Sequence, residues 1–134
     1  MTRINVGIPP AELGDRHLMA EHREIKRIPN LVNRGRYSLD NQPSMFKLGT
    51  GHVKFFYDKL LYLKRRYDSL YNECKKRGFN VTNYAQAWSG TPEHLMNDYT
   101  PTERDRIIIK QRIDERIRAS NKRSLRRQRS SKSN

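Results

Sequence analysis

Apolar side chains recur at alternating spacings of three and four residues between positions 52 and 77, a pattern that predicts one helix with a single buried face. The stripe consists of Val53, Phe56, Leu60, Leu63, Tyr67, Leu70 and Cys74. Gly78 follows a basic last turn and is a typical helix stop. Other parts of the chain must cover a stripe of this length, so the sequence predicts a core built around this helix.

A second helix is predicted over about residues 13–32. Leu18, Ile25 and Val32 recur every seven residues and share one stripe at about 100° per residue. Pro29 lies inside this pattern. It should kink or end the helix, because proline lacks a backbone N–H and its ring crowds the preceding turn.

The third predicted helix has a clear N-terminal signal. Thr100 can cap it, Pro101 suits the first helical position and Glu103 can complete a capping box. Its expected buried face consists of Ile107, Ile108, Ile109, Ile113 and Ile117. Beyond Ala119 the Ser, Arg and Lys composition cannot build a core, so we expect a disordered tail.

The remaining stretches have the composition of loops. Residues 1–12 are expected to form an irregular arm, because Pro9-Pro10 disrupts regular structure. No segment alternates apolar and polar residues as a strand would. The chain has 134 residues, which suits one domain. We therefore expect an all-α fold: a single compact domain of three main helices with long loops over residues 1–118, and a disordered basic C-terminal tail over residues 119–134.

The charge predicts a polyanionic partner. Lys and Arg number 28 against 14 Asp and Glu, a net charge of +14. Residues 118–134 carry seven of the cations and no carboxylate, so about half of the excess belongs to the rest of the chain. Such a field attracts nucleic acid. A membrane surface is the weaker candidate because the tail has no apolar anchor, and no apolar run approaches the roughly 20 residues of a membrane span.

The Cys and His residues argue against disulfides and metal sites. Cys74 is the single cysteine, which excludes an intramolecular disulfide and a cysteine-based zinc cluster. The four histidines lack ligand spacing, so no metal is expected. His52, at a predicted helix start, is a candidate for a phosphate contact or a helix cap. Trp88 is a candidate wedge for a base stack, although a lone tryptophan more often packs a loop onto the core.

One face of the first predicted helix is polar and charged. His17, Arg23, Glu24 and Arg27 lie on the side away from the apolar stripe. An ionised glutamate there can stabilise a developing cation and move protons, while arginines bind phosphates. From spacing alone, a solvated helix face with an i,i+3 pair between Glu24 and Arg27 is the simpler interpretation.

Thr2 is a candidate for a different kind of chemistry. A small residue at this position normally allows removal of the initiator methionine, which exposes the Thr2 α-amine. Such an amine titrates near about 8, below a lysine at about 10.4, so more of it is neutral and nucleophilic at physiological pH. An amine nucleophile can form a Schiff base with C1′ of a sugar. By itself, however, Thr2 is an ordinary second residue.

Several blocks of the sequence match those of a known family, in the same order. The blocks are Met1-Thr2-Arg3-Ile4-Asn5, His17-Leu18-Met19-Ala20-Glu21, Arg23-Glu24, Gly51-His52-Val53, Phe55-Phe56-Tyr57-Asp58-Lys59-Leu60, Lys76-Arg77-Gly78-Phe79-Asn80, Asp98-Tyr99 and Arg112-Ile113-Asp114-Glu115. In these blocks the chain closely resembles the phage and algal-virus pyrimidine-dimer DNA glycosylases, also called phage endonuclease V. The resemblance spans residues 1–118.

The resemblance implies both the chemistry and its residues. The Thr2 amine would attack C1′ of the damaged nucleotide and Glu24 would serve the proton steps, as in an N-glycosylase with abasic-site lyase activity on cyclobutane pyrimidine dimers. The residues implied in DNA binding are Arg3, His17, Arg23, Arg27 and Arg112, and we expect Arg116 to bind DNA as well. Members of the family use no metal or other cofactor, kink the duplex and flip out an adenine opposite the lesion.

Alternatives remain for the substrate and for the activity. The best-known member of the family ends in an aromatic-rich segment near the lesion, whereas this chain has no aromatic residue after Tyr99. Another damaged or hypermodified base is therefore an alternative substrate. A non-catalytic DNA-binding protein would not need Thr2 and Glu24, and no His pair suggests a ribonuclease. We expect a monomer that acts on lesion-bearing double-stranded DNA. Its expected location is the cytoplasm, which would be the cytoplasm of a host cell if the protein is virus-encoded.

Overall fold

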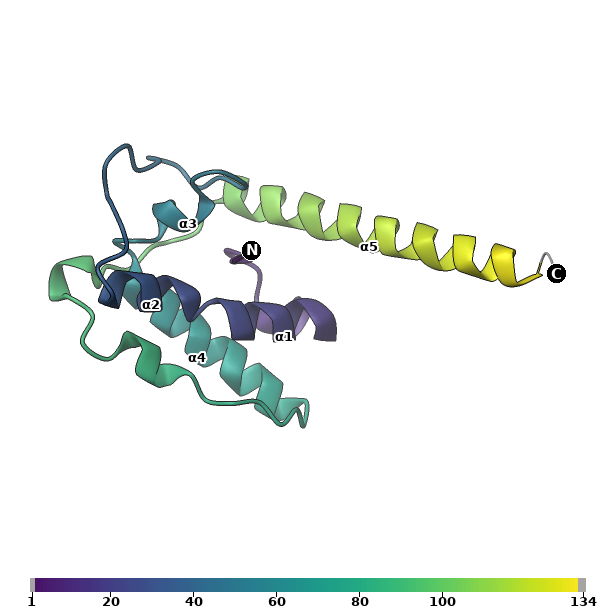
Figure 1. The fold of residues 1–134 in the computed structure, drawn as a ribbon, viewed down its shortest axis with the longest axis horizontal. Helices are drawn as coiled ribbons and strands as arrows, with labels where there is room; N and C mark the ends of the chain where they lie inside the picture. Colours follow the sequence, from purple (N-terminus) through teal and green to yellow (C-terminus); the bar gives the residue numbers. More distant parts are fainter. Residues whose placement is uncertain (1, 133–134) are drawn as a thin grey trace.

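The protein is built from helices and short 3-10 turns. A computed structural model describes the backbone of residues 2–132 and the side chains of residues 2–126. The helices are α1 (Asp15–Glu24), α2 (Arg27–Asn33), α3 (His52–Phe55), α4 (Leu60–Lys76) and α5 (Glu103–Lys132), and the turns are η1 (Pro10–Glu12), η2 (Ala85–Trp88) and η3 (Glu93–Leu95) (Figure 1). The described residues contain no β-strand. The predicted all-α fold is confirmed.

The helix predicted over residues 52–77 is interrupted, so that α3 and α4 are separate. Side chains donate hydrogen bonds to the carbonyl groups at the end of α3. Gln42 Nε2 donates to the carbonyls of Lys54 at 3.1 Å and Phe55 at 3.2 Å. Lys59 Nζ donates to the carbonyl of Phe55 at 2.9 Å. These acceptors are satisfied without a further helical turn, so the chain can change direction there.

The helix predicted over residues 13–32 is also two helices, α1 and α2, which meet at Ile25 and Lys26. Pro29 explains the break. Its ring would clash with the carbonyl four residues earlier, which belongs to Ile25, and it has no N–H to donate there. The N–H of Ile28 bonds to the Ile25 carbonyl instead, at 3.3 Å. The interruption that Pro29 predicts is therefore present, but it lies one turn before the proline.

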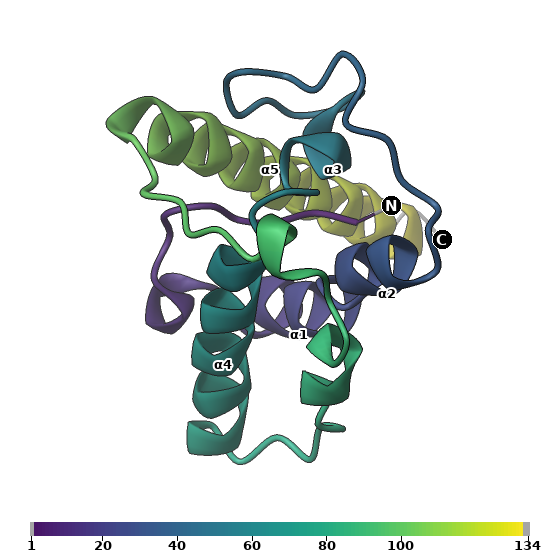
Figure 2. The same ribbon diagram turned by 90° about the vertical axis from the view of Figure 1, so that its left-hand side faces the viewer.

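The N-terminal arm, residues 2–9, runs through the interior of the protein. Ile4 and Val6 are fully buried and Ile8 is 4% exposed. Figure 2 shows the arm crossing between α5 and the layer formed by α1 and α4. Gly7 has a φ of 77°, and a Cβ there would lie 2.8 Å from Cγ of Arg106. The arm has the irregular backbone predicted for it, yet it is part of the core.

The capping box of α5 lies two residues after the predicted one. Thr102 Oγ1 accepts the Asp105 N–H at 3.2 Å, and the Asp105 carboxylate accepts the Thr102 N–H at 3.0 Å. The Tyr99 hydroxyl donates to the same carboxylate. The prediction of a box from Thr100 and Glu103 is wrong, because Asp105 is buried and takes the reciprocal bonds while Glu103 is exposed.

The buried face of α5 is narrower than its isoleucines predict. Ile109 is fully buried, and Ile108 and Ile113 are partly buried against the core. Ile107 and Ile117 are 47% and 46% exposed, so including them in the buried face was wrong. At about 100° per residue, Ile107 lies on the side of the helix opposite the buried Ile109. Beyond its first half α5 leaves the domain (Figure 1).

Residues 119–132, part of the expected disordered tail, form the outer segment of α5 (Figure 1). None of residues 119–126 is buried, so they add nothing to the core, as their composition predicts. Met1, Ser133 and Asn134 lie outside the described residues. Among the described helices, none is long and apolar enough to cross a membrane.

The two threonines at the start of α5 provide a test of the observed cap. We expect Thr102→Ala to lower the free energy of unfolding by about 1 kcal/mol, the usual cost of losing an N-cap side chain, as measured by urea denaturation. Thr100→Ala is the matched control, because Thr100 is exposed and its side chain has no hydrogen bond to a described residue. Equal losses in the two variants would contradict the assignment of Thr102 as the cap.

Candidate functional site

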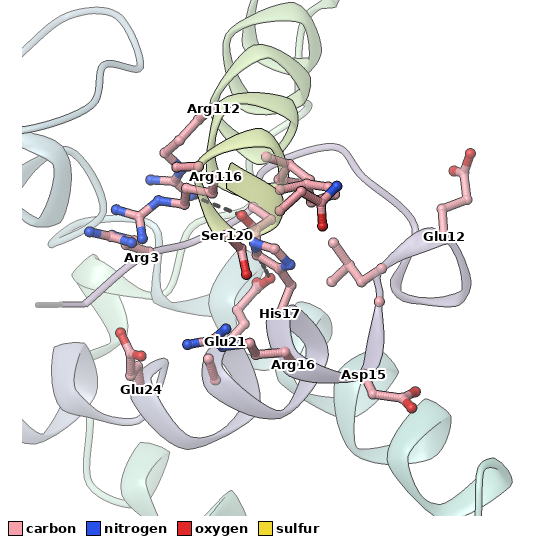
Figure 3. A pocket seen from close by; sticks show the side chains of 18 of the residues that line it. Arg3, Glu12, Asp15, Arg16, His17, Glu21, Glu24, Arg112, Arg116 and Ser120 are labelled. Atoms are coloured by element: carbon pink, nitrogen blue, oxygen red, sulfur yellow. Dashed lines mark hydrogen bonds between the residues drawn. The ribbon is translucent and has the colours of Figure 1, made fainter. Parts of the chain in front are cut away.

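A cleft of about 620 Å³ lies between the arm, α1 and α5 (Figure 3). Its volume falls within the range of about 300–1,000 Å³ that is typical of ligand sites. The predicted site residues that line it are Arg3, His17, Glu24, Arg112 and Arg116. Arg23 and Arg27 do not line it. The structure therefore brings together residues from the two ends of the chain.

A buried ion pair supports the floor of this cleft. Glu21 is 2% exposed and Arg66 is 8% exposed. The guanidinium of Arg66 donates to both carboxylate oxygens of Glu21, the Nη2 contact being 2.9 Å. Arg66 Nη1 also donates to the Ile8 carbonyl at 2.9 Å. Buried charges require such pairing and hydrogen bonding, so this pair ties α1 and α4 to the arm.

Asn5 extends this connection to α5. Its Nδ2 donates to Glu21 Oε1 at 2.7 Å, and its Oδ1 accepts from Arg112 Nη2 at 2.9 Å. One amide thus joins a carboxylate on α1 to a cation on α5. The side chain of Arg112 is thereby held against the cleft.

Three cations converge at one end of the cleft, Arg3 from the arm and Arg112 and Arg116 from α5 (Figure 3). Burial and the nearby Arg3 and Arg116 lower the pKa of Arg112 to about 10. Burial and Arg3 also lower the pKa of Arg116. Among the described residues, none of the three forms an ion pair with a carboxylate. Crowded cations without counter-charges repel one another, so this end of the cleft favours an anion.

His17 lies beside these arginines, half-buried in the cleft. Burial, followed by the charges of Arg116 and Arg112, lowers its pKa below the ordinary 6.5. At neutral pH the imidazole is therefore neutral, and it can donate a hydrogen bond to an anion without adding a fourth positive charge.

Glu24 lines the cleft from the last turn of α1. Its side chain is 15% exposed, and Arg23 and Arg27 each approach its carboxylate only to 4.0 Å. Its Oε1 is buried and has no hydrogen-bond partner among the described residues. The side chains of Arg23 and Arg27 are 60% and 47% exposed. The predicted charged face is thus divided: His17 and Glu24 enter the cleft, and the two arginines flank Glu24 on the surface.

The start of the arm brings Thr2 to the edge of the cleft. Thr2 is half-buried and is not itself a lining residue. It precedes the lining residue Arg3, and consecutive Cα atoms are about 3.8 Å apart. Ile4, two residues on, is fixed by its buried side chain and by an N–H bond to His52 Nε2 at 3.0 Å.

His52 has a different role from either of those predicted for it. It is 4% exposed, and the N-cap of α3 is Gly51, so both the phosphate contact and the helix cap are wrong. Burial outweighs the hydrogen bond to the Lys47 carbonyl and lowers its pKa to about 4. The ring is therefore neutral, with Nδ1 donating to Lys47 at 2.9 Å and Nε2 accepting from Ile4. His52 anchors the arm.

The other candidates from the sequence lie away from the cleft. Trp88 is 6% exposed, its Nε1 donates to the Leu60 carbonyl at 3.1 Å and its ring packs on Tyr67. It is a packing residue and not a wedge. Within the described part of the chain, no group of three or more His, Cys, Asp or Glu side chains is placed to hold a metal ion.

The supporting residues Asn5, Glu21 and Arg66 were missed by the sequence predictions. A signal for two of them exists. Glu21 falls on the apolar stripe of α1, and Arg66 falls beside Tyr67 on that of α4. A charged residue at a core position of a helix needs a buried partner, and one carboxylate and one guanidinium on two such stripes indicate each other.

Residues 1–87 match a family model described as pyrimidine dimer DNA glycosylase. The matched part contains the arm and helices α1 to α4, and with them Thr2, Arg3, His17 and Glu24. Helix α5, which supplies Arg112 to the cleft, follows the matched part.

The neutral, buried state of His52 predicts how stability depends on pH. The unfolded chain binds a proton at His52 near the ordinary pKa of 6.5, whereas the folded protein resists it down to about 4. Stability contributed by His52 is therefore complete above pH 6.5 and is lost as pH falls towards 4. The loss amounts to about 3 kcal/mol, at 1.36 kcal/mol per pKa unit.

Urea denaturation at several pH values between 4 and 7 measures this loss, with His52→Gln as the control. Glutamine can accept from Ile4 and donate to Lys47 but does not titrate. We expect a shallower decline of stability with acid in the variant. Parallel declines would contradict the assignment of a neutral, buried His52.

Proposed function

The chain belongs to the pyrimidine dimer DNA glycosylase family, a family of DNA-repair enzymes, and on this basis we propose that it excises cyclobutane pyrimidine dimers and then cuts the strand as an abasic-site lyase. One observation carries the mechanism: the buried Oε1 of Glu24 accepts no hydrogen bond from the described residues, in a cleft crowded with cations. A carboxylate oxygen without a hydrogen bond costs stability, and such a cost is typical of a group kept free for catalysis.

The first step requires a nucleophile at the edge of the cleft. After removal of Met1, the Thr2 amine attacks C1′ of the damaged nucleotide, forming a C1′–N bond as the bond from C1′ to the base breaks. The base leaves with a proton. As this bond breaks, the Glu24 carboxylate stabilises the positive charge that develops on the sugar. Opening of the sugar ring then gives an imine between Thr2 and C1′.

Strand cleavage follows from the imine. Glu24 removes a proton from C2′, and the electrons of that bond form a double bond as the C3′–O3′ bond breaks. The departing phosphate carries the 3′ oxygen away, and water hydrolyses the imine to free the Thr2 amine. Every step uses groups of the chain, water and the substrate.

The cations hold the DNA in this position. Arg3, Arg112 and Arg116 bind phosphate at the crowded end of the cleft, and His17 donates to the same group. Arg23 and Arg27, exposed beside Glu24, contact phosphates outside the cleft. A phosphate fixed by Arg3 also keeps the adjoining Thr2 amine in register with C1′.

A second substrate has support from the composition of the cleft. None of the described residues that line it is Phe, Tyr or Trp. A base inside it would therefore lack the large aromatic rings on which flipped bases commonly stack, and the same chemistry on another damaged or hypermodified base is the alternative. A DNA-binding protein without catalysis is a further alternative, which the following experiment separates.

Borohydride trapping tests the imine. The protein is incubated with EDTA, borohydride and duplex DNA that carries a thymine dimer, an abasic site or no lesion. We expect covalent complexes with the first two, mapped by mass spectrometry to the Thr2 amine. Trapping with the abasic duplex alone would keep the mechanism and point to another base. No trapping at all, by protein shown to lack Met1, would leave only DNA binding.

A catalytic Glu24 predicts a separation of activity from affinity. Glu24→Gln should reduce excision by about 10²- to 10⁴-fold, the usual contribution of a general acid–base group, and leave dimer-duplex binding nearly unchanged. Single-turnover excision and equilibrium binding are measured in parallel. Glu12→Gln, at an exposed carboxylate of the same cleft, is the control and should keep full activity. Undiminished excision by Glu24→Gln would remove Glu24 from the mechanism.

A further inference from the structure

The outer part of α5 extends beyond the domain. In Figure 1 this helix continues past every other element, and its residues 121–126 are exposed. The segment contributes no core residue, yet Ser120 and Arg123 line the cleft. Part of this protruding helix is therefore also a wall of the site.

The cations of α5 are divided between two faces. Arg112, Arg116 and Arg123 all line the cleft, and at about 100° per residue they fall within about 40° of one another on the helix. Arg118 does not line the cleft and lies about 140° from Arg123 around the helix axis. The cleft-facing stripe continues the crowded cations of the site outward.

This stripe has no counter-charge of its own. Glu115 is the last carboxylate of the sequence. Neither Arg116 nor Arg123 forms an ion pair or a side-chain hydrogen bond with another described residue. Like charges one turn apart destabilise a helix, and a short helical segment without packing is marginal in water. An external anion would therefore stabilise the helical form of this segment.

We propose that residues 117–126 of α5 form a second DNA-binding element, which lies along the phosphate backbone beside the lesion and is held helical by it. The stretch from Arg112 to Arg123 is roughly 16 Å long at 1.5 Å per residue. At about 3.4 Å per base pair this corresponds to about five base pairs. The proposal rests on the proposed function, because DNA in the cleft sets the direction of the contact.

A matched pair of variants tests which face binds. Arg123→Ala and Arg118→Ala remove the same side chain and charge from opposite faces of one helix. Affinity for a lesion-free duplex of about three helical turns is measured against salt concentration. We expect Arg123→Ala to weaken binding and lower the slope of log K against log salt by about 0.9, the value for one phosphate. Arg118→Ala should keep the slope of the parent, although it lies closer to the domain.

A second pair tests whether the helix matters or only its charge. Ser120→Pro keeps the net charge but breaks the helix, whereas Ser120→Ala keeps both. We expect Ser120→Pro to bind the long duplex as weakly as Arg123→Ala and Ser120→Ala to bind like the parent. The circular dichroism signal of helix should rise when the parent binds this duplex, and rise less in Ser120→Pro.

The outcomes that overturn the proposal are distinct from those that overturn the glycosylase chemistry. Equal effects of Arg123→Ala and Arg118→Ala would mean diffuse attraction, and parent-like binding by Ser120→Pro would mean an unstructured charged tail. Either result refutes the helical element. Borohydride trapping of the parent on an abasic duplex of about one helical turn tests the glycosylase chemistry separately from binding of the long duplex. Loss of trapping in the parent would refute the proposed function instead.

Discussion

The buried pair of Glu21 and Arg66 is the interaction on which the site depends. Two charges taken from water are stable only if each finds enough partners, and here Asn5 and the Ile8 carbonyl complete the set. Both completing groups belong to the arm. Satisfying the pair therefore draws the arm through the core and brings its first residues to the cleft.

The cleft brings together charged groups whose interactions are unfavourable in the free protein and which bound DNA would relieve under the proposed function. Arg3, Arg112 and Arg116 converge, none of them ion-paired with a carboxylate of the described chain, and burial adds to the electrostatic cost at Arg112. On the other side Glu24 keeps a carboxylate oxygen without a hydrogen bond. Each arrangement is unfavourable in the free protein. Under the proposed function, the phosphates of the DNA would relieve the crowded cations, and the cationic sugar would relieve the Glu24 carboxylate.

The two halves of helix α5 differ in their contacts with the domain. Its first half is joined to the domain by the cap at Thr102, the buried Ile109 and the bond from Arg112 to Asn5. Its outer half has no such support and is exposed.

The sequence by itself determined the properties that depend on neighbouring residues. It determined the helical class, the polar face with His17 and Glu24, and, through the resemblance, the family. The tertiary structure decided where the helices break, which threonine caps α5 and what His52 does. The reason is sequence separation: His52 meets Ile4 across 48 residues, and Arg112 meets Asn5 across 107. Helical periodicity carries no information about such contacts, although the charges of Glu21 and Arg66 at core positions indicate that a contact of this kind must exist.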